Sequence, residues 1–132
     1  MPITFHPDPG TLLVCDFSTG FQPPEMVKKR PIVVISPRRR VGSGICTVVP
    51  ISTTSPHNPQ PYHHQLNPAS VPQQWRGVAQ WAKCDMVTTV GHNRLELIRI
   101  KNFGQNRQYV SYRITDDDLK AILAAVGVAL GI

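Results

Sequence analysis

The first group in this chain that can do chemistry is an arginine at the entrance of an apolar run. Arg30-Pro31 is followed by Ile-Val-Val-Ile at residues 32–35, and Glu25 lies five residues upstream. The β-branched run is typical of a strand covered on both faces, and Pro31 suits its first position, where a missing amide donor is tolerated. Arg30 keeps its charge at neutral pH. We therefore expect it either to pair with Glu25 or Asp16 or to bind a phosphate.

Three more polar groups follow or interrupt apolar runs farther along the chain. Ser52 ends one such run, where its hydroxyl can hydrogen-bond a phosphate or cap the turn that begins there. Lys83 and Asp85 are two residues apart and share one side if this piece is a strand. Such a pair can be a phosphate-binding cation beside a base, or simply a surface salt bridge, which the residues alone favour.

The charge of the chain suits a polyanionic partner. Fourteen Lys and Arg against 8 Asp and Glu give a net charge of +6 and a pI near 9.7. Three of the acidic residues, Asp116, Asp117 and Asp118, stand together near the C-terminus, so the rest of the chain is more basic still. No basic amphipathic helix is visible, which favours nucleic acid over a membrane as the partner.

Cysteines and histidines give no sign of a metal or cofactor site. Cys15, Cys46 and Cys84 lie in apolar runs without CxxC spacing, and their odd number argues against a disulfide framework. His63 and His64 point apart if extended, and solvent exposure or base stacking is favoured for them and for His57. With no signal peptide and no apolar run near the length of a membrane span, we expect a soluble cytoplasmic protein with reduced thiols, no membrane association, no metal and no cofactor.

The elements that must position these groups are short strands followed by one helix. Strands are expected at 11–17, 31–36, 45–51, 78–84, 86–90, 95–100 and 108–114, with a long polar loop over 52–77. A helix is predicted over 115–131, capped by Thr115 and begun by three aspartates that favour its positive end. Residues 1–132 are therefore predicted to form one mainly β domain, a small barrel with a C-terminal helix.

Read in order, several pieces of the chain resemble the MazF/PemK toxins of bacterial toxin–antitoxin pairs. The resemblance covers about residues 10–100 and the terminal helix. It rests on Gly10-Thr11-Leu12, Cys15-Asp16-Phe17, Gly20, Glu25, Lys29 to Ser36, Val48 to Thr53, Trp81 to Asp85, Thr88-Thr89-Val90 and Arg94-Leu95. Two positions depart from the usual pattern, because Ser52 stands where many members have Thr and Lys83 where one branch has Arg.

The resemblance implies a homodimeric SH3-like barrel that cleaves single-stranded RNA, such as mRNA, at short sequences without a metal. It also implies inhibition by a cognate antitoxin. Attack by the 2′-hydroxyl would leave a 2′,3′-cyclic phosphate and a 5′-hydroxyl, and this needs a proton acceptor, a proton donor and positive charge on the phosphate. The candidate catalytic residues are Arg30, Ser52, Asp85, Lys83 and Glu25.

The expected RNA-binding residues are basic, hydroxyl-bearing or aromatic groups near those positions. They are Lys28, Lys29, Arg38, Arg39, Arg40, Thr53, His57, Trp75 and Arg76. Of the two tryptophans, Trp75 is expected to stack on a base and Trp81 to pack in the core. Two other functions fit the same fold: a CcdB-type toxin that inhibits gyrase, which would not need Arg30, Ser52, Lys83 and Asp85, and a non-catalytic RNA- or DNA-binding module.

Overall fold

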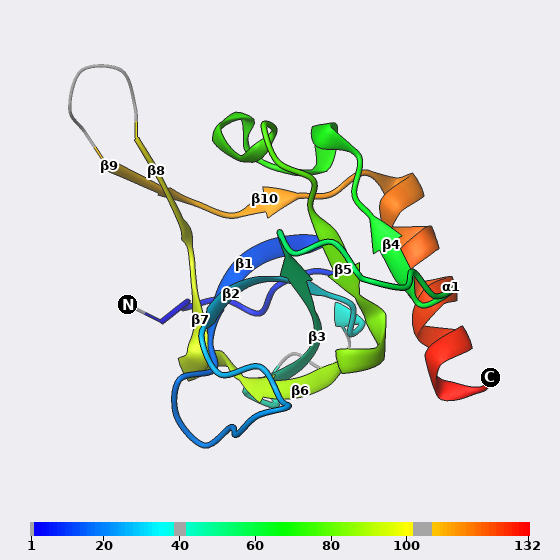
Figure 1. The fold of residues 1–132 in the computed structure, drawn as a ribbon. Coiled ribbons are helices and arrows are strands. Elements are labelled where there is room, and N and C mark those ends of the chain that lie inside the picture. The colour runs from blue at the N-terminus through cyan, green and yellow to red at the C-terminus, as the bar shows by residue number, and fades with distance from the viewer. Residues whose placement is uncertain (1, 39–41, 102–106) are drawn as a thin grey trace.

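The computed structural model describes residues 2–38, 42–101 and 107–132, and it shows short strands followed by one helix (Figure 1). The strands are β1 (Thr11–Asp16), β2 (Lys29–Val34), β3 (Ile45–Ser52), β4 (His63–Gln65), β5 (Trp81–Lys83), β6 (Thr88–Gly91), β7 (Leu95–Glu96), β8 (Ile98–Lys101), β9 (Arg107–Val110) and β10 (Tyr112–Arg113). Short 3-10 helices are η2 (Pro68–Ser70), η3 (Gln73–Trp75), η4 (Cys84–Met86) and η5 (His92–Arg94). Helix α1 (Asp116–Leu130) ends the chain. The predicted mainly β class with one C-terminal helix is confirmed.

The main sheet curls around a common interior. β1 pairs antiparallel with β2 and β2 with β3, while β6 pairs with β3 and β7 with β1. Within the described ranges no pairing joins β6 to β7, which η5 connects, so hydrogen bonds do not close the barrel into a full ring. The sheet continues past β3 through β5 to the edge strand β4. β8 and β9 form a separate hairpin that projects from the barrel (Figure 1).

Side chains of the first three strands alternate between two cores. One cluster lies inside the curled sheet and includes Leu13, Ile32 and Val48, all fully buried. The other lies on the opposite face, where Val33 and Ile51 meet α1 through residues such as Ile122. The expectation that residues 32–35 are covered on both faces holds for residues 32–34, which are fully buried, while Ile35 is half-buried.

Two prolines end the ladder between β2 and β3. The last pair sets Ile32 opposite Pro50, and Pro31 is the residue of β2 directly before Ile32. Neither proline has an amide donor, so the two strands cannot continue their ladder there. β3 then pairs on its other edge with β5, Ser52 opposite Trp81. The strand itself begins at Lys29, two residues before the predicted start, because pairing with β1 extends to Asp16 opposite Lys29.

The predicted 52–77 loop contains three short elements. β4 pairs with β5, and η2 and η3 follow it. The sequence pattern does not predict strand β4, because His-His-Gln shows no apolar alternation and the pairing of β4 depends on contacts distant in sequence. Helix α1 packs against β4 and η4. Thr115 caps its N-terminus by accepting the amide of Asp118, and Gly131 ends it at a φ of 74°, as predicted for residues 115–131.

All three cysteines are free and buried. Burial raises the pKa of Cys15 to about 12, and burial likewise raises that of Cys84 to about 12. Thiols of this kind pack as small apolar groups and are poor nucleophiles.

Candidate active site

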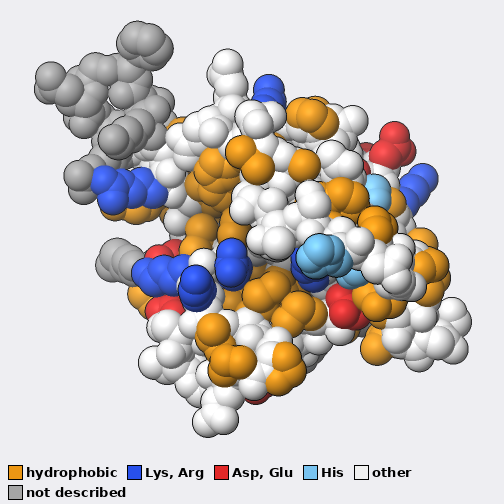
Figure 2. All heavy atoms as spheres, in the orientation of Figure 1, with side chains coloured by type: hydrophobic (Ala, Val, Ile, Leu, Met, Phe, Trp, Pro, Cys, Tyr) orange, Lys and Arg blue, Asp and Glu red, His pale blue; other side chains and the backbone are white. Residues whose placement is uncertain are grey.

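A pocket of about 290 Å³ opens at the mouth of the curled sheet. It lies between the loop that joins β1 to β2 and the segment from η4 into β6. Its lining is largely apolar with two carboxylates: Phe17, Phe21, Pro24, Glu25, Met26, Pro50, Asp85, Met86, Val87 and Thr88. On the face shown in Figure 2, Lys and Arg side chains form a band from the left edge to the centre, with hydrophobic side chains below it. Apolar walls beside a basic band suit the bases and phosphates of a nucleic acid.

Arg30 does not itself line this pocket, but the strand register places it nearby. It is opposite Cys15 on β1, and by strand alternation it shares the inner face of the sheet with Ile32 and Val34. Two residues that line the pocket come from the strands that flank β2: Phe17 directly follows β1, and Pro50 belongs to β3. Among the described residues no carboxylate pairs with the half-buried guanidinium, and its Nε is buried without a hydrogen-bond partner. The expected alternative, an ion pair with Glu25 or Asp16, is therefore wrong.

Both of those carboxylates have other partners. The Glu25 carboxylate accepts a hydrogen bond from the Gln22 amide at 3.2 Å. The Asp16 carboxylate accepts from the amide and hydroxyl of Ser18 at 2.8 and 2.5 Å, and these bonds lower the pKa of Asp16. Arg30 thus brings a fixed positive charge close to the pocket, and no carboxylate of the described residues neutralises it.

Ser52 and Lys83 occupy one face of neighbouring strands. Ser52 is 7% exposed, and its Oγ accepts the amide of Thr54 at 3.1 Å, so it does cap the turn as the simpler interpretation expected. Its hydroxyl proton is still available to donate. Because Ser52 is opposite Trp81 on β5, the side chains of Trp81 and Lys83 share its face. The indole Nε1 of Trp81 is buried without a hydrogen-bond partner in the described structure.

Asp85 lies elsewhere than its spacing from Lys83 predicts. The chain turns through η4 after Lys83, so Asp85 is not on a strand and the two do not share a side. No ion pair forms between them among the described residues, which excludes the predicted surface salt bridge there. Asp85 is exposed and lines the pocket together with Glu25. The structure thus brings these two carboxylates to one pocket, which the sequence spacing did not reveal.

The predicted basic track is only partly continuous. Lys28 and Lys29 are exposed just before Arg30, and Lys29 forms an ion pair with Glu96 at 3.4 Å. Arg38 lies beyond the other end of β2 and pairs with Asp8 at 2.8 Å. At about 3.3 Å per strand residue, that places it roughly 25 Å along the chain from Arg30, so it does not extend a track beside the pocket. Arg39 and Arg40 lie outside the described residues.

Four other predicted RNA-binding residues lie in the segment after β3. Thr53 and His57 are exposed. Trp75 packs against the helix-side core and is half-buried, so only part of its ring is exposed, and its stacking on a base stays a prediction. Arg76 donates from Nε to the Val71 carbonyl at 3.1 Å and from Nη2 to the Tyr112 hydroxyl at 3.1 Å. Its guanidinium therefore has a structural role in this segment.

The sequence did not predict that Trp81 and His63 also lie on the Ser52 face. Trp81 was expected in the core, but it belongs to neither core cluster of the described residues. His63 on β4 is opposite Lys83, and its Nδ1 accepts the Gln60 amide at 3.0 Å. Neither could be found without the β4–β5–β3 register, because the signal is spread over three segments. Only the alternation Trp-Ala-Lys at residues 81–83 hints that Trp81 and Lys83 share a side.

Arg94 braces the loop that forms one wall of the pocket. Its Nη1 donates to the carbonyls of Asp16 and Thr19 at 3.0 and 2.8 Å, and its guanidinium lies 4.7 Å from the centre of the Phe21 ring. The side chain comes from η5, so one residue of the β6–η5–β7 connection fixes the loop that carries Glu25 and Met26.

We expect Arg94→Ala to loosen this loop and to lower whatever activity the pocket has. Loss of two charge-assisted hydrogen bonds should cost about 2–3 kcal/mol of the free energy of unfolding. Arg94→Lys, whose ammonium keeps the charge but lacks the planar guanidinium that lies over Phe21, should recover less than half of that. Urea unfolding monitored by tryptophan fluorescence measures the cost, and equal stability of Arg94→Ala and wild type would show that the brace is unimportant.

Two kinds of feature, a metal-binding cluster and a membrane-spanning helix, are absent from the described residues. No three His, Cys, Asp or Glu side chains gather as a metal ion would require. No helix in the described part of the chain has the length and apolar character of a membrane span.

Known sequences similar to this chain include a toxin family and one protein of Escherichia coli. The model of a family described as PemK-like, MazF-like toxin of type II toxin-antitoxin system matches residues 8–130. The protein YifN of Escherichia coli K12 is 28% identical over 145 residues, 96% of this chain and 95% of YifN.

Solved structures agree in fold. MazF from Deinococcus radiodurans (Form-I) superimposes with a TM-score of 0.68 at 20% identity, covering 96% of this chain and 97% of that one. A mycobacterial endoribonuclease in complex with its cognate antitoxin gives 0.64 at 18% identity, over 96% and 97%. Since the family model spans nearly the whole chain, this protein belongs to the PemK-like, MazF-like toxins of type II toxin–antitoxin systems.

Proposed function

We propose that this toxin is a metal-independent, sequence-specific endoribonuclease that cleaves single-stranded RNA. The observation that carries the proposal is Arg30: the side chain is half-buried near the pocket, and its Nε is buried without a protein partner in the described structure. An unsatisfied buried donor on a charged group is costly, and a phosphate of the substrate would satisfy it. The likeness to structures of endoribonucleases supports the same activity.

In the proposed reaction the 2′-hydroxyl oxygen attacks the adjacent phosphorus while the bond from phosphorus to the 5′-oxygen breaks. The 2′-hydroxyl proton passes to a base, and the departing 5′-oxygen receives a proton. Arg30 stabilises the extra negative charge on the phosphate oxygens, because its fork matches two of them and cannot lose its proton. The dependence on the 2′-hydroxyl makes the reaction specific for RNA over DNA.

The other candidate residues have narrower roles. The Ser52 hydroxyl donates a hydrogen bond to a phosphate oxygen, while its Oγ accepts one from the Thr54 amide. Lys83, on the same face, adds charge for the phosphate or a proton for the leaving oxygen. Glu25 and Asp85 are the two carboxylates of the pocket, and either one can accept the 2′-hydroxyl proton. Lys28 attracts the phosphate backbone of the RNA, and Trp81 provides a surface on which a base stacks.

The toxin is proposed to work in the bacterial cytoplasm as a homodimer held inactive by an antitoxin. This rests on family membership and on the similarity to toxin structures solved with antitoxin, including MazE-MazF of Deinococcus radiodurans, with a TM-score of 0.61 at 18% identity. A basic surface band beside a largely apolar pocket suits an acidic, partly apolar antitoxin segment as well as RNA.

The test is cleavage of a mixed-sequence single-stranded RNA by purified protein in the presence of EDTA. We expect a small set of defined fragments, no cutting of the matching DNA, and a loss of roughly tenfold in Ser52→Ala that Ser52→Thr restores. Cleavage abolished by EDTA would contradict the metal-independent mechanism. Intact RNA together with trapped gyrase–DNA complexes would support a CcdB-type function instead.

A further inference from the structure

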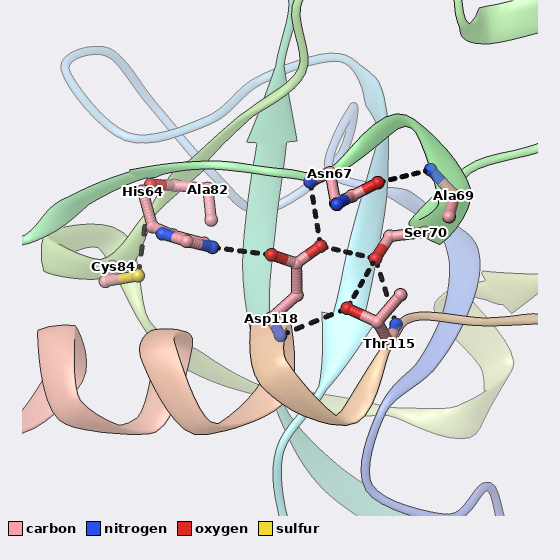
Figure 3. Close-up of polar contacts among 8 residues, drawn as sticks. All are labelled: His64, Asn67, Ala69, Ser70, Ala82, Cys84, Thr115 and Asp118. Carbon is pink, nitrogen blue, oxygen red and sulfur yellow. Dashed lines mark hydrogen bonds and ion pairs between the residues drawn. The ribbon is translucent and has the colours of Figure 1, made fainter.

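Asp118, in the first turn of α1, holds together parts of the chain that are far apart in sequence. Its side chain is buried, 5% exposed. One carboxylate oxygen lies 2.8 Å from Nε2 of His64 on β4, and the other accepts the Asn67 amide at 2.8 Å and the Ser70 hydroxyl (Figure 3). Every polar contact of this carboxylate goes to residues 64–70.

Ser70 and Thr115 complete the network. The fully buried Ser70 Oγ accepts the Thr115 amide at 2.9 Å, and the Thr115 Oγ1 accepts the Asp118 amide at 3.1 Å (Figure 3). The cap of the helix and the anchoring of residues 64–70 are thus one connected set of hydrogen bonds. Networks of this kind have a defined geometry because each member is costly to leave unpaired.

The strand that this network holds needs outside support. β4 has three residues, lies at the edge of the sheet and pairs only with β5 in the described structure. A strand so short contributes little stability by itself. Its alternation turns His64 toward α1 and turns His63 to the other face, opposite Lys83. Fixing His64 therefore also fixes where His63 lies.

His63 is suited to contact a ligand on that face. Because its Nδ1 accepts the Gln60 amide, the neutral ring carries its proton on Nε2, which is then a donor. Strands lie about 4.8 Å apart, and His63 is displaced by two residues from Gln65, the β4 residue level with Ser52, so His63 is roughly 12 Å from Ser52. At that separation it reaches a nucleotide beside the scissile phosphate rather than the phosphate itself.

We propose that Asp118 is a positioning residue for RNA binding: by holding β4 on β5 it places His63 beside Lys83 and extends the Ser52 face by one nucleotide subsite. This role rests on the proposed RNA cleavage. The substrate group bound there is a phosphate or base acceptor of the neighbouring nucleotide. The network itself exists without RNA, so it can be tested separately.

The experiment compares Asp118→Asn with Asp117→Asn, which removes an equal charge from the same helix turn at an exposed position. Hydrogen exchange of residues 63–70 should rise at least roughly tenfold in Asp118→Asn only. KM for RNA should also rise roughly tenfold in this variant, with kcat within about twofold of wild type. His63→Ala should raise KM similarly, and the double variant should be no worse than either single variant.

Each departure from this pattern has its own meaning. Unchanged exchange in Asp118→Asn would overturn the anchoring role. Faster exchange with unchanged KM, or fully additive effects with His63→Ala, would overturn the positioning role. Wild-type protein that leaves RNA intact would overturn the proposed function and with it the role in RNA binding, while the exchange result would still test the anchor. Should Asp118→Asn not fold, Ser70→Ala gives the same comparison with a smaller change.

Discussion

Replacement of Arg30 by alanine is expected to lower kcat for RNA cleavage by a factor of about 10²–10³, close to complete loss in a gel assay. The reason is electrostatic: the half-buried guanidinium is a fixed charge near the pocket, and no described carboxylate neutralises it. Arg30→Lys should recover only part of the rate, because an ammonium group keeps the charge but loses the two-pronged geometry. Stability should fall little, since the side chain makes no ion pair that would be lost.

The matched control for this prediction is Lys28→Ala. Lys28 is an exposed cation two residues away, so its removal should raise KM by a few fold and leave kcat unchanged. Single-turnover cleavage of a labelled oligonucleotide separates the two effects. A kcat in Arg30→Ala within threefold of wild type would exclude Arg30 from the chemical step.

The second large effect concerns the stability of the protein in acid. Burial alone would raise the pKa of Asp118, but hydrogen bonds from Ser70, His64 and the Asn67 amide outweigh it and lower that pKa. A carboxyl group whose pKa is lower in the folded state stabilises the fold above its ordinary pKa, and this contribution is lost as the pH falls through the lowered value. We therefore expect wild type to lose stability below about pH 4.

Asp118→Asn should remove this dependence. At pH 7 the variant should lose about 2–3 kcal/mol of the free energy of unfolding, because three hydrogen bonds to an ionised group are weakened. The difference between wild type and variant should shrink as the pH falls from 5 to 3. Urea titrations across that range measure it, with Asp117→Asn expected to stay within about 0.5 kcal/mol of wild type. A difference that does not change with pH would show that the charge of Asp118 is not what stabilises the fold.

The features predicted best from the sequence are those in which local pattern and tertiary structure agree. Residues 32–34 form a strand because their apolar side chains fill both cores, and α1 forms with the cap and the end that Thr115 and Gly131 indicate. Arg30 belongs to β2 and Ser52 to β3, each next to a proline-marked strand end. Their proximity followed from the resemblance and from the strand pattern.

Predictions failed where the position of a side chain depends on contacts between distant segments. Asp85 would share a side with Lys83 if this piece were a strand, yet the 3-10 turn η4 moves it into the pocket. Trp75 in the polar segment packs on a core, while Trp81 in the apolar one lies on the Ser52 face. The Asp118 network joins residues 48 to 54 positions apart in sequence, which no local periodicity reveals.

The central claim is that this pocket cleaves RNA through the 2′-hydroxyl next to the scissile phosphate. The most direct test is mass spectrometry of the fragments from an oligonucleotide cut at one mapped site, alongside the same oligonucleotide with a single 2′-O-methyl group at that site. The account predicts a 2′,3′-cyclic phosphate and a 5′-hydroxyl from the first and no cutting of the second. A 5′-phosphate product, or equal cutting of the methylated strand, would contradict it.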